Sequence, residues 1–440
     1  MRQTVRLLLA MVAATFALSV SAQEFPSRWF FGKDYNAPIQ EAWENQGVIR
    51  ATDIGDAELK IVKADGSRVD NCLLMYNKPV AGPVSEGDCI LVEFPETDLP
   101  AGSFLEFDIT FAAEEGAPSK WIFEYFDGTW KSGRTYTVYG SVFESKHQFT
   151  SVLETFRLTD RAEGTLKMRM RALKSNPVKP LDSVAAKQKA SVVIQGSSYL
   201  GMYVQNLGTA APSDTLKTIY IGNSFTYYCS SPALLKEIAW NEGHYIEMTP
   251  ALKGGAYFSQ HLKFKTTSDA IARGDFDLAI MQDHSKCPVA VGKDKKEAAQ
   301  YLDAASALAE KIRATSPDCR FIIEYRSSTT AKNDFYGCGS LDKYNKMTLR
   351  GTKLMAKAMG GAELSHITEA FMIVRRDRPD IVILAPDGTH PSMLGAYLKS
   401  CINYLTIYGE KFGSNPANCG IDPEVAAYLR SVAEKVVLAR

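Results

Sequence analysis

The sequence lacks an excess of charge of either sign. Fifty lysine and arginine residues balance fifty aspartate and glutamate residues, so the formal net charge at pH 7 is zero. Proteins that bind nucleic acid or anionic membranes usually carry a basic surface, because the phosphates they contact are negatively charged. We therefore expect no nucleic-acid partner, and a neutral or weakly charged ligand suits this chain better.

Cysteine pairs with metal-ligand spacing are also lacking. None of the eight cysteines falls into a C-x-x-C pair, which leaves a structural zinc site without support. His244, His261 and His366 likewise show no metal-ligand spacing, so we expect no metal and no organic cofactor. Cys72 and Cys89 are the only cysteines before residue 200, and we predict a local disulfide between them, with buried free thiols as the alternative.

The apolar stretch at the N-terminus is too short to span a membrane. It runs from Leu7 to Val20, whereas a bilayer requires ~20 residues. Arg2 and Arg6 precede it, and small residues ending at Ala22 follow it, which is the pattern of a signal peptide and its cleavage site. We predict a signal peptide over residues 1–22 in place of a membrane anchor, and export to the periplasm or out of the cell.

The rest of the chain falls into two halves that differ in their pattern of apolar and polar residues. Its 440 residues exceed the roughly 250–300 residues at which single cores stop growing. From residue 23 to 210 the sequence reads as short segments of alternating apolar and polar residues, separated by turns. In "LKMRMRAL", for example, Leu166, Met168 and Met170 fall on one face of a strand. Many short strands without intervening helices predict an all-β sandwich over residues 23–210.

Aromatic residues gather in one part of this predicted sandwich. They are Trp121, Tyr125, Phe126, Trp130, Tyr136 and Tyr139. On an exposed face they would stack on sugar rings and make the domain carbohydrate-binding, whereas on an inward face they would fill the core. Alternation places Trp121, Phe123 and Tyr125 on one face, which favours the core.

Beyond the predicted linker "LGTAAPSD", residues 207–214, apolar strands alternate with helical patterns. The predicted strands are "KTIYIGNS", "YIEMTPAL", "DLAIMQD" and "RFIIEYR", and one helical pattern covers residues 295–314. Near-continuous apolar strands joined by helices are typical of a parallel sheet covered on both faces. We predict a three-layer α/β/α domain over residues 215–440, with its ligand at the carboxyl ends of the strands.

Ser224 follows the first of these strands, in the segment "IGNSFTYY". A serine at such a place commonly caps the next helix, and the alternative is a nucleophile. Asp387 and His390 favour the nucleophile, because they lie three residues apart in "DGTHP", before a further helical segment. A carboxylate so placed can fix the tautomer of the imidazole and stabilise the imidazolium that forms when the ring takes a proton from serine. An Asp-Gly turn with an incidental histidine is the other interpretation of this motif.

These motifs resemble those of the SGNH (GDSL-like) hydrolase superfamily. The nucleophile block of that family reads Gly-Asp-Ser, and this sequence has Gly222-Asn223-Ser224. The last block reads Asp-x-x-His-Pro, and this sequence has Asp387, His390 and the proline after it. The resemblance covers residues 215–412 and implies a flavodoxin-like fold, with Ser224 as nucleophile, His390 as base and Asp387 orienting the base. The motif G-x-S-x-G does not surround Ser224, which argues against an α/β-hydrolase nucleophile elbow.

The family's other two blocks supply the oxyanion hole, and this sequence matches them less closely. The second block is a glycine after the second strand, for which the sequence offers Gly254 and Gly255, the latter favoured. The third block, Gly-x-Asn-Asp, has no counterpart in "IMQDHSKCP" after the third strand. The candidate donors there are Gln282, through its amide, and His284, through its ring.

The resemblance implies an exported serine esterase that removes acyl groups, above all acetyl, from carbohydrate. Its partner would be an acylated glycan or another small ester, and Tyr325 and Arg326 at the end of "RFIIEYR" are candidate substrate contacts. For the arginine, a buried ion pair is the alternative. Two other functions stay open: a non-catalytic glycan-binding protein on the same fold, motivated by the missing third block, and a lipase or thioesterase of the same superfamily.

Overall fold

The computed structural model describes residues 58–69, 84–113, 115–142, 146–148, 150–179, 192–194, 203–326, 336–385 and 388–439. The predicted signal peptide, Cys72 and Asp387 lie outside these ranges. None of the helices within them is both long enough and apolar enough to span a membrane.

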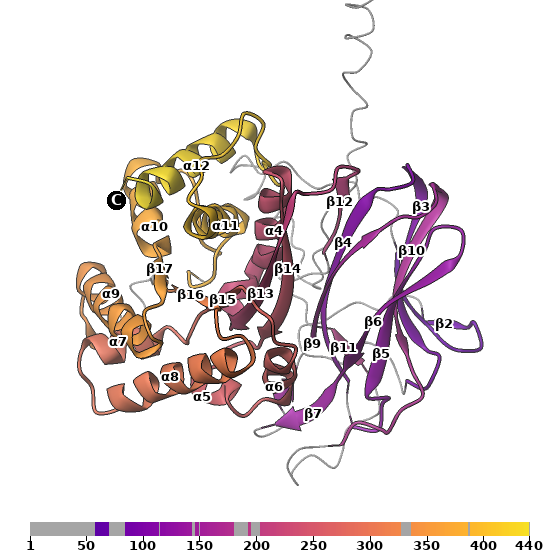
Figure 1. Ribbon diagram of the computed structural model, residues 1–440, viewed down its shortest axis with the longest axis horizontal. Coiled ribbons are helices and arrows are strands. Elements are labelled where there is room, and N and C mark those ends of the chain that lie inside the picture. Colours follow the sequence, from indigo (N-terminus) through magenta and orange to yellow (C-terminus); the bar gives the residue numbers. More distant parts are fainter. Residues whose placement is uncertain are drawn as a thin grey trace, which may run out of the picture.

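Two antiparallel sheets pack face to face in the N-terminal half (Figure 1). One has six strands in the order β2-β1-β3-β10-β5-β6, and the other has the order β11-β4-β12, with β9 also paired to β4. Strands β7 and β8 form a separate pair. The bounds are β1 Glu58–Val62, β2 Arg68–Val69, β3 Cys89–Leu99, β4 Phe104–Ala113, β5 Lys120–Phe126, β6 Trp130–Thr137, β7 Tyr139–Val142, β8 Lys146–Gln148, β9 Thr150–Arg157, β10 Ala162–Ala172, β11 Val192–Ile194 and β12 Tyr203–Gly208.

Strand β10 follows the predicted alternation. Leu166, Met168 and Met170 are fully buried in the core between the two sheets. On the other face of the strand, Arg169 and Arg171 donate to Glu124 of β5, at 2.7 and 2.6 Å. Period-two alternation thus sends apolar side chains inward and leaves charged ones to pair across strands.

Trp121, Phe123 and Tyr125, which the alternation places on one face, are buried in the core as predicted. Of the other aromatic residues in the cluster, Tyr136 is buried, whereas Phe126, Trp130 and Tyr139 are partly or fully exposed. Trp121, Tyr125 and Tyr136 are only 1%, 9% and 6% exposed. Trp130 is more exposed, and the guanidinium carbon of Arg169 lies over its ring, 3.6 Å from the centroid. The buried members therefore have no free face on which a sugar could stack.

The predicted disulfide between Cys72 and Cys89 is wrong. Cys89 is a buried free thiol at the start of β3, and burial raises its pKa to about 11. Its partners across the two neighbouring strands are Val62 and Arg171, so no cysteine stands opposite it in the sheet.

A five-stranded parallel sheet, in the order β14-β13-β15-β16-β17, forms the centre of the C-terminal half. Its strands are β13 Asp214–Gly222, β14 His244–Leu252, β15 Leu278–Met281, β16 Arg320–Glu324 and β17 Glu363–Ser365. Its helical segments are α3 Ser224–Tyr227, the 3₁₀ turn Tyr228–Ser230, α4 Ser231–Asn241, α5 Phe258–His261, α6 Lys265–Ala272, α7 Lys286–Gly292, α8 Ala298–Thr315, α9 Leu341–Ala358, α10 Ile367–Asp377, α11 Met393–Tyr408 and α12 Pro423–Val437. With the second strand outside the first, this is the flavodoxin-like order, so the chain leaves β13 where the winding direction reverses.

Helices cover both faces of this sheet (Figure 1). Tyr220 and Ile280 point into one core with α4, α10, α11 and α12, whereas Ile221 and Met281 point into the other with α7, α8 and α9. Consecutive residues of one strand are buried in opposite cores because the side chains of a strand alternate between the two faces of the sheet. The predicted mixed α/β organisation with a parallel sheet is confirmed.

The two halves meet along β14, an edge strand of the parallel sheet that packs beside β9. Lys236 of α4 pairs with Glu106 of β4 at 2.7 Å, and the two side chains are 3% and 0% exposed. Arg134 of β6 pairs with Glu247 of β14 at 2.9 Å. Charges buried this deeply require good pairing geometry, because each ion loses its hydration. The Lys236–Glu106 pair therefore favours a single arrangement of the two halves.

Candidate active site

Ser224 is the first residue of the four-residue helix α3, directly after β13. The residue that caps this helix is Asn223, whose side-chain oxygen accepts from the backbone N–H of Phe225 at 3.2 Å. The interpretation of Ser224 as the helix cap is therefore wrong, because Asn223 is the cap. Gly222 lets the helix fold back on the strand end, since a Cβ at this position would lie 2.1 Å from Thr226 Oγ1.

The structure brings His390 to Ser224 from 166 residues away, and its Nε2 lies 2.7 Å from Ser224 Oγ. The imidazole stacks on the ring of Tyr228, with centroids 3.9 Å apart and planes within 11°. Its loop turns through Gly388, which has a φ of 64°, and is closed by the Ala385 N–H bonded to His390 O at 2.8 Å. Asp387 lies outside the described residues, so its role stays a prediction.

The predicted substrate contact at Tyr325 is wrong. Tyr325 is 2% exposed, and its hydroxyl donates to the carboxylate of Glu369 on α10 at 2.6 Å. Burial alone would raise the pKa of Glu369, but hydrogen bonds from His366 and Tyr325 outweigh it and lower that pKa to about 2. Tyr325 lies one residue beyond β16, and its bond to Glu369 holds it on the face of the sheet that α10 covers.

Arg326 links two loops of the site. Its guanidinium donates to Thr389 O at 3.1 Å and to Ser285 Oγ at 2.8 Å. The first bond holds the residue before His390, and the second holds the loop after β15. The side chain is thus engaged by the protein on both sides, which gives it a positioning task beside the predicted contact with substrate.

The turn containing Gly254 and Gly255 lies against the loop of Ser224. Asn223 Nδ2 donates to Ala256 O at 3.1 Å, and Lys253 N donates to Gly222 O at 3.0 Å. Gly255 is exposed at the turn and has a φ of 66°, which is unfavourable for residues with a Cβ. The structure therefore brings the second predicted block to the nucleophile loop.

Gln282 is only 2% exposed and is held inside the protein. Its side-chain oxygen accepts from Thr226 Oγ1 at 3.3 Å and from Asn223 N at 3.4 Å, and its amide nitrogen donates to Asp283 O. These bonds hold the side chain of Gln282 against residues 222–226, the segment that contains Ser224. Gln282 is thus a support of that segment, which weakens its case as an oxyanion donor.

His284 is partly exposed, in contrast to Gln282. Its ring stacks on Tyr257 at 4.4 Å, and its Nδ1 accepts from Lys286 N at 3.2 Å. Burial and then the charges of Arg326 and Lys286 lower the pKa of His284 to about 4. At neutral pH the ring is therefore uncharged, and because Nδ1 accepts a hydrogen bond, its proton lies on Nε2.

Three other features of the site have no signal in the motif comparison. Tyr228 stacks on His390, and the only sign of this in the sequence is that Tyr228 lies four residues after Ser224.

His261 is 1% exposed. Its Nε2 donates to Gly222 O at 3.1 Å, and its Nδ1 accepts from Thr267 Oγ1 at 2.8 Å. Lys399 is fully buried beneath α3, and its clue is a lone lysine in an apolar helix.

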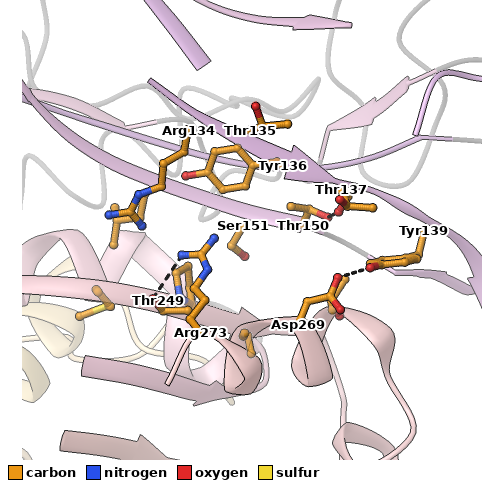
Figure 2. Close-up of a pocket in the computed structure, with 16 residues that line it drawn as sticks. Arg134, Thr135, Tyr136, Thr137, Tyr139, Thr150, Ser151, Thr249, Asp269 and Arg273 are labelled. Atoms are coloured by element: carbon orange, nitrogen blue, oxygen red, sulfur yellow. Dashed lines mark hydrogen bonds between the residues drawn. The ribbon is translucent and has the colours of Figure 1, made fainter. Parts of the chain in front are cut away.

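A second candidate site is a polar cavity of about 170 Å³ between the two halves (Figure 2). Arg134 of β6 and Arg273 after α6 approach it from opposite sides (Figure 2), and Arg273 donates to Thr249 Oγ1 at 3.3 Å. The hydroxyl groups that line it belong to Thr135, Tyr136, Thr137, Tyr139, Thr150, Ser151, Thr249 and Thr266. This volume is on the order of five or six water molecules.

In the described part of the chain, no three side chains of histidine, cysteine, aspartate or glutamate come together in a way that could hold a metal ion. The site itself brings together Ser224, His390 and nearby N–H donors. Groups of these kinds can act as a nucleophile, a base and hydrogen-bond donors to a developing oxyanion.

We predict that His261 makes folding stability depend on pH. Burial lowers its pKa from 6.5 to about 4 in the native state. Between these values the unfolded chain binds a proton that the native chain does not, so stability falls as pH falls, by on the order of 3 kcal/mol at most. In His261→Gln, urea unfolding at pH 7 and pH 5 should show a smaller difference than in wild type. An unchanged pH difference would contradict this assignment.

Searches of protein-family models and of curated proteins give no match. Among solved structures, the chain is similar to a DUF4886 family protein from Bacteroides uniformis, with a TM-score of 0.42, 17% identity, and coverage of 51% of this chain and 95% of that one. It is also similar to a family two carbohydrate esterase from Clostridium thermocellum (TM-score 0.33, 11% identity, coverage 74% and 94%). A third similar structure is Axe2, an acetylxylan esterase from Geobacillus stearothermophilus (TM-score 0.34, 15% identity, coverage 47% and 99%). These values are too low to carry a functional assignment, which has to rest on the chain's own residues.

Proposed function

We propose that this protein is an exported serine esterase that removes acyl groups, above all acetyl, from carbohydrate. The observation that carries the proposal is the 2.7 Å contact between Ser224 Oγ and His390 Nε2. The contact joins two distant segments at the carboxyl end of a parallel sheet, where such folds bind ligands. Both side chains are partly exposed, whereas Asn223 and Phe225 beside Ser224 are buried.

The proposed reaction follows from these atoms. Ser224 Oγ attacks the ester carbonyl while His390 Nε2 takes its proton, and the tetrahedral intermediate then expels the alcohol, which receives that proton. Water attacks the resulting acyl-serine in the same way, so acid and Ser224 are released and His390 is again neutral. Asp387 orients His390 in this scheme. The stack on Tyr228 limits the rotation of the imidazole during both transfers.

We assign the oxyanion hole to the backbone N–H groups of Ser224 and Gly255 and to Nε2–H of His284. A neutral imidazole with its proton on Nε2 is a fixed donor that does not compete with His390 for a proton. Gln282 is less suitable because its amide nitrogen already donates to Asp283 O, while its amide oxygen accepts from Thr226 Oγ1.

The carbohydrate part of the proposal comes from the family resemblance, in which secreted members with an added β-sandwich often act on acylated polysaccharides. Fold does not determine substrate. A lipase of the same superfamily would differ from the proposed esterase in preferring long acyl chains, and a thioesterase would differ in preferring thioesters.

Replacing the nucleophile gives the direct test. We expect Ser224→Ala to lower kcat/KM for p-nitrophenyl acetate by on the order of 10⁴-fold, because no other group attacks the carbonyl. Ser268→Ala changes an exposed serine on α6 and should keep the wild-type rate. Equal rates for wild type and Ser224→Ala would overturn the proposal, and a strong preference for p-nitrophenyl decanoate over acetate would favour a lipase.

A second test addresses the oxyanion hole. We expect His284→Ala to lower kcat by about 10²- to 10³-fold at pH 7, since one donor to the oxyanion is lost. His284→Asn keeps a neutral N–H donor and should retain more activity. His244→Ala, at the amino end of β14, is the matched control. A wild-type kcat in His284→Ala would remove this residue from the oxyanion hole.

The cavity between the halves favours a second function, glycan binding without catalysis. It is lined by two arginines, Asp269 and several threonines, whose side chains are of the donor and acceptor types that sugar hydroxyls use. This function would need no turnover at Ser224. It is also compatible with the esterase, in which the cavity would hold a part of the polymer remote from the ester.

We expect Arg273→Ala to weaken the binding of acetylated xylo-oligosaccharides by about 10-fold or more, because a hydrogen bond to a charged donor is lost. Calorimetric titration measures this effect, and Arg376→Ala on α10 is the control. Equal affinities in the two variants would exclude the cavity as a glycan site. Binding by wild type with no fluorophosphonate labelling of Ser224 would favour glycan binding over catalysis.

A further inference from the structure

Helix α3 is too short to satisfy its own carbonyl groups. It has four residues, and the backbone N–H of its C-cap residue Tyr228 donates to Ser224 O. Cys229 and Ser230 both have a φ of 52°, so the chain turns to the left and does not continue the helix. The carbonyls of Phe225 and Thr226 therefore need donors from elsewhere in the protein.

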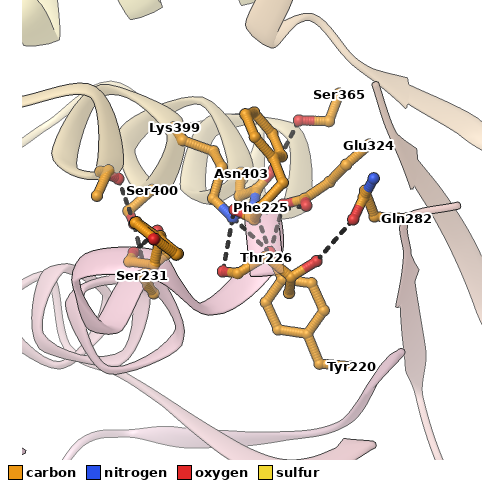
Figure 3. Close-up of polar contacts among 12 residues, drawn as sticks. Tyr220, Phe225, Thr226, Ser231, Gln282, Glu324, Ser365, Lys399, Ser400 and Asn403 are labelled. Atoms are coloured by element: carbon orange, nitrogen blue, oxygen red, sulfur yellow. Dashed lines mark hydrogen bonds and ion pairs between the residues drawn. The ribbon is translucent and has the colours of Figure 1, made fainter. Parts of the chain in front are cut away.

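Lys399 of α11 supplies these donors (Figure 3). Its Nζ donates to Thr226 O at 2.8 Å and to Phe225 O at 3.2 Å. The side chain has no exposed surface, which is rare for lysine because burial removes the hydration of its charge. A lysine in such a place must have strong compensating contacts.

The compensating charge is Glu324 at the end of β16, whose carboxylate lies 3.6 Å from Lys399 Nζ and is also fully buried. Glu324 in turn accepts from Asn403 Nδ2 at 2.6 Å and from the hydroxyl of Tyr220. Ser365 donates to Asn403 Oδ1 at 2.6 Å and closes the network. The chain of bonds thus joins β13, β16, β17 and α11 below the nucleophile helix.

We propose that Lys399 is a positioning residue for the nucleophile, and this inference rests on the proposed esterase function. By holding the carbonyl end of α3, it fixes the helix whose first residue is Ser224 and keeps Oγ at 2.7 Å from His390 Nε2. Glu324 is the counter-ion that permits the buried charge. Lys399 contacts no reacting atom, so it acts on catalysis only through the placement of Ser224.

The test separates this role from simple charge balance. Lys399→Met leaves Glu324 buried and unpaired, so we expect it to lose both stability and activity. The double variant Lys399→Met/Glu324→Gln removes both charges and should recover thermal stability. It should not recover the bonds to α3, so kcat for p-nitrophenyl acetate should stay about 10- to 100-fold low with KM within about twofold of wild type.

A matched pair of variants controls for the loss of a buried ion pair. Lys236→Met/Glu106→Gln removes the pair between α4 and β4, which bonds no carbonyl of α3. We expect this variant to keep the wild-type kcat. A folded Lys399→Met/Glu324→Gln protein with wild-type kcat would overturn the inference and leave Lys399 as a balancing charge only.

A milder variant decides the question should the methionine double variant not fold. Lys399→Gln/Glu324→Gln keeps an amide donor on a side chain one bond shorter than lysine, so its kcat should be about 10-fold below wild type and above that of the methionine double variant. A wild-type kcat here would also overturn the inference. Ser224→Ala is measured in the same assay. If wild type hydrolyses the ester no faster than Ser224→Ala, the proposed function is wrong. If wild type is active and the Lys399 variants have the same kcat as wild type, only the positioning role of Lys399 is wrong.

Discussion

A helix of four residues cannot satisfy its own backbone, and the arrangement of this site depends on that constraint. Asn223 supplies the acceptor at the start of α3, and Lys399 supplies the donors at its end. Because Asn223 takes the capping role, the hydroxyl of Ser224 is left to meet His390. Gly222 makes room for the helix at the strand end. The proposed nucleophile is thus placed by residues that have no part in the proposed reaction.

Polar residues in the interior link this placement to the sheet. Gln282 at the end of β15 and His261 of α5 both bond the loop of Gly222 and Asn223, and neither is more than 2% exposed. Buried polar groups are costly unless they are bonded, so each such bond holds its partner in one geometry. The Lys399–Glu324 pair lies beneath the active site and the Lys236–Glu106 pair lies between the two halves. Replacement of a buried ion pair by apolar side chains often costs no stability. We therefore infer that these two pairs contribute a specific arrangement of the elements they join.

The sequence was sufficient for features that depend on local periodicity. The alternation in β10 and the apolar strands β13 to β16 were predicted because burial of each face follows from spacing along the chain. Side-chain direction at strand ends was not predictable in this way. Tyr325 and Arg326 are neighbours in sequence, yet one bonds Glu369 of α10 and the other bonds the loop of His390. The role of Asn223 as the helix cap was also missed, because asparagine and serine are both good capping residues and the sequence does not say which of the two neighbours caps the helix.

The two histidines at the proposed site must behave in opposite ways, and their surroundings account for the difference. A base has to accept a proton from serine, so His390 lies against Ser224 Oγ with its carbonyl held by Ala385 N–H. A donor to an oxyanion must instead keep its proton and stay uncharged. His284 meets that demand because burial and the neighbouring Arg326 oppose its protonation, while the N–H of Lys286 occupies Nδ1. Arg326 bonds the His390 loop as well, so one guanidinium holds the loop of the proposed base and helps to keep the proposed donor neutral.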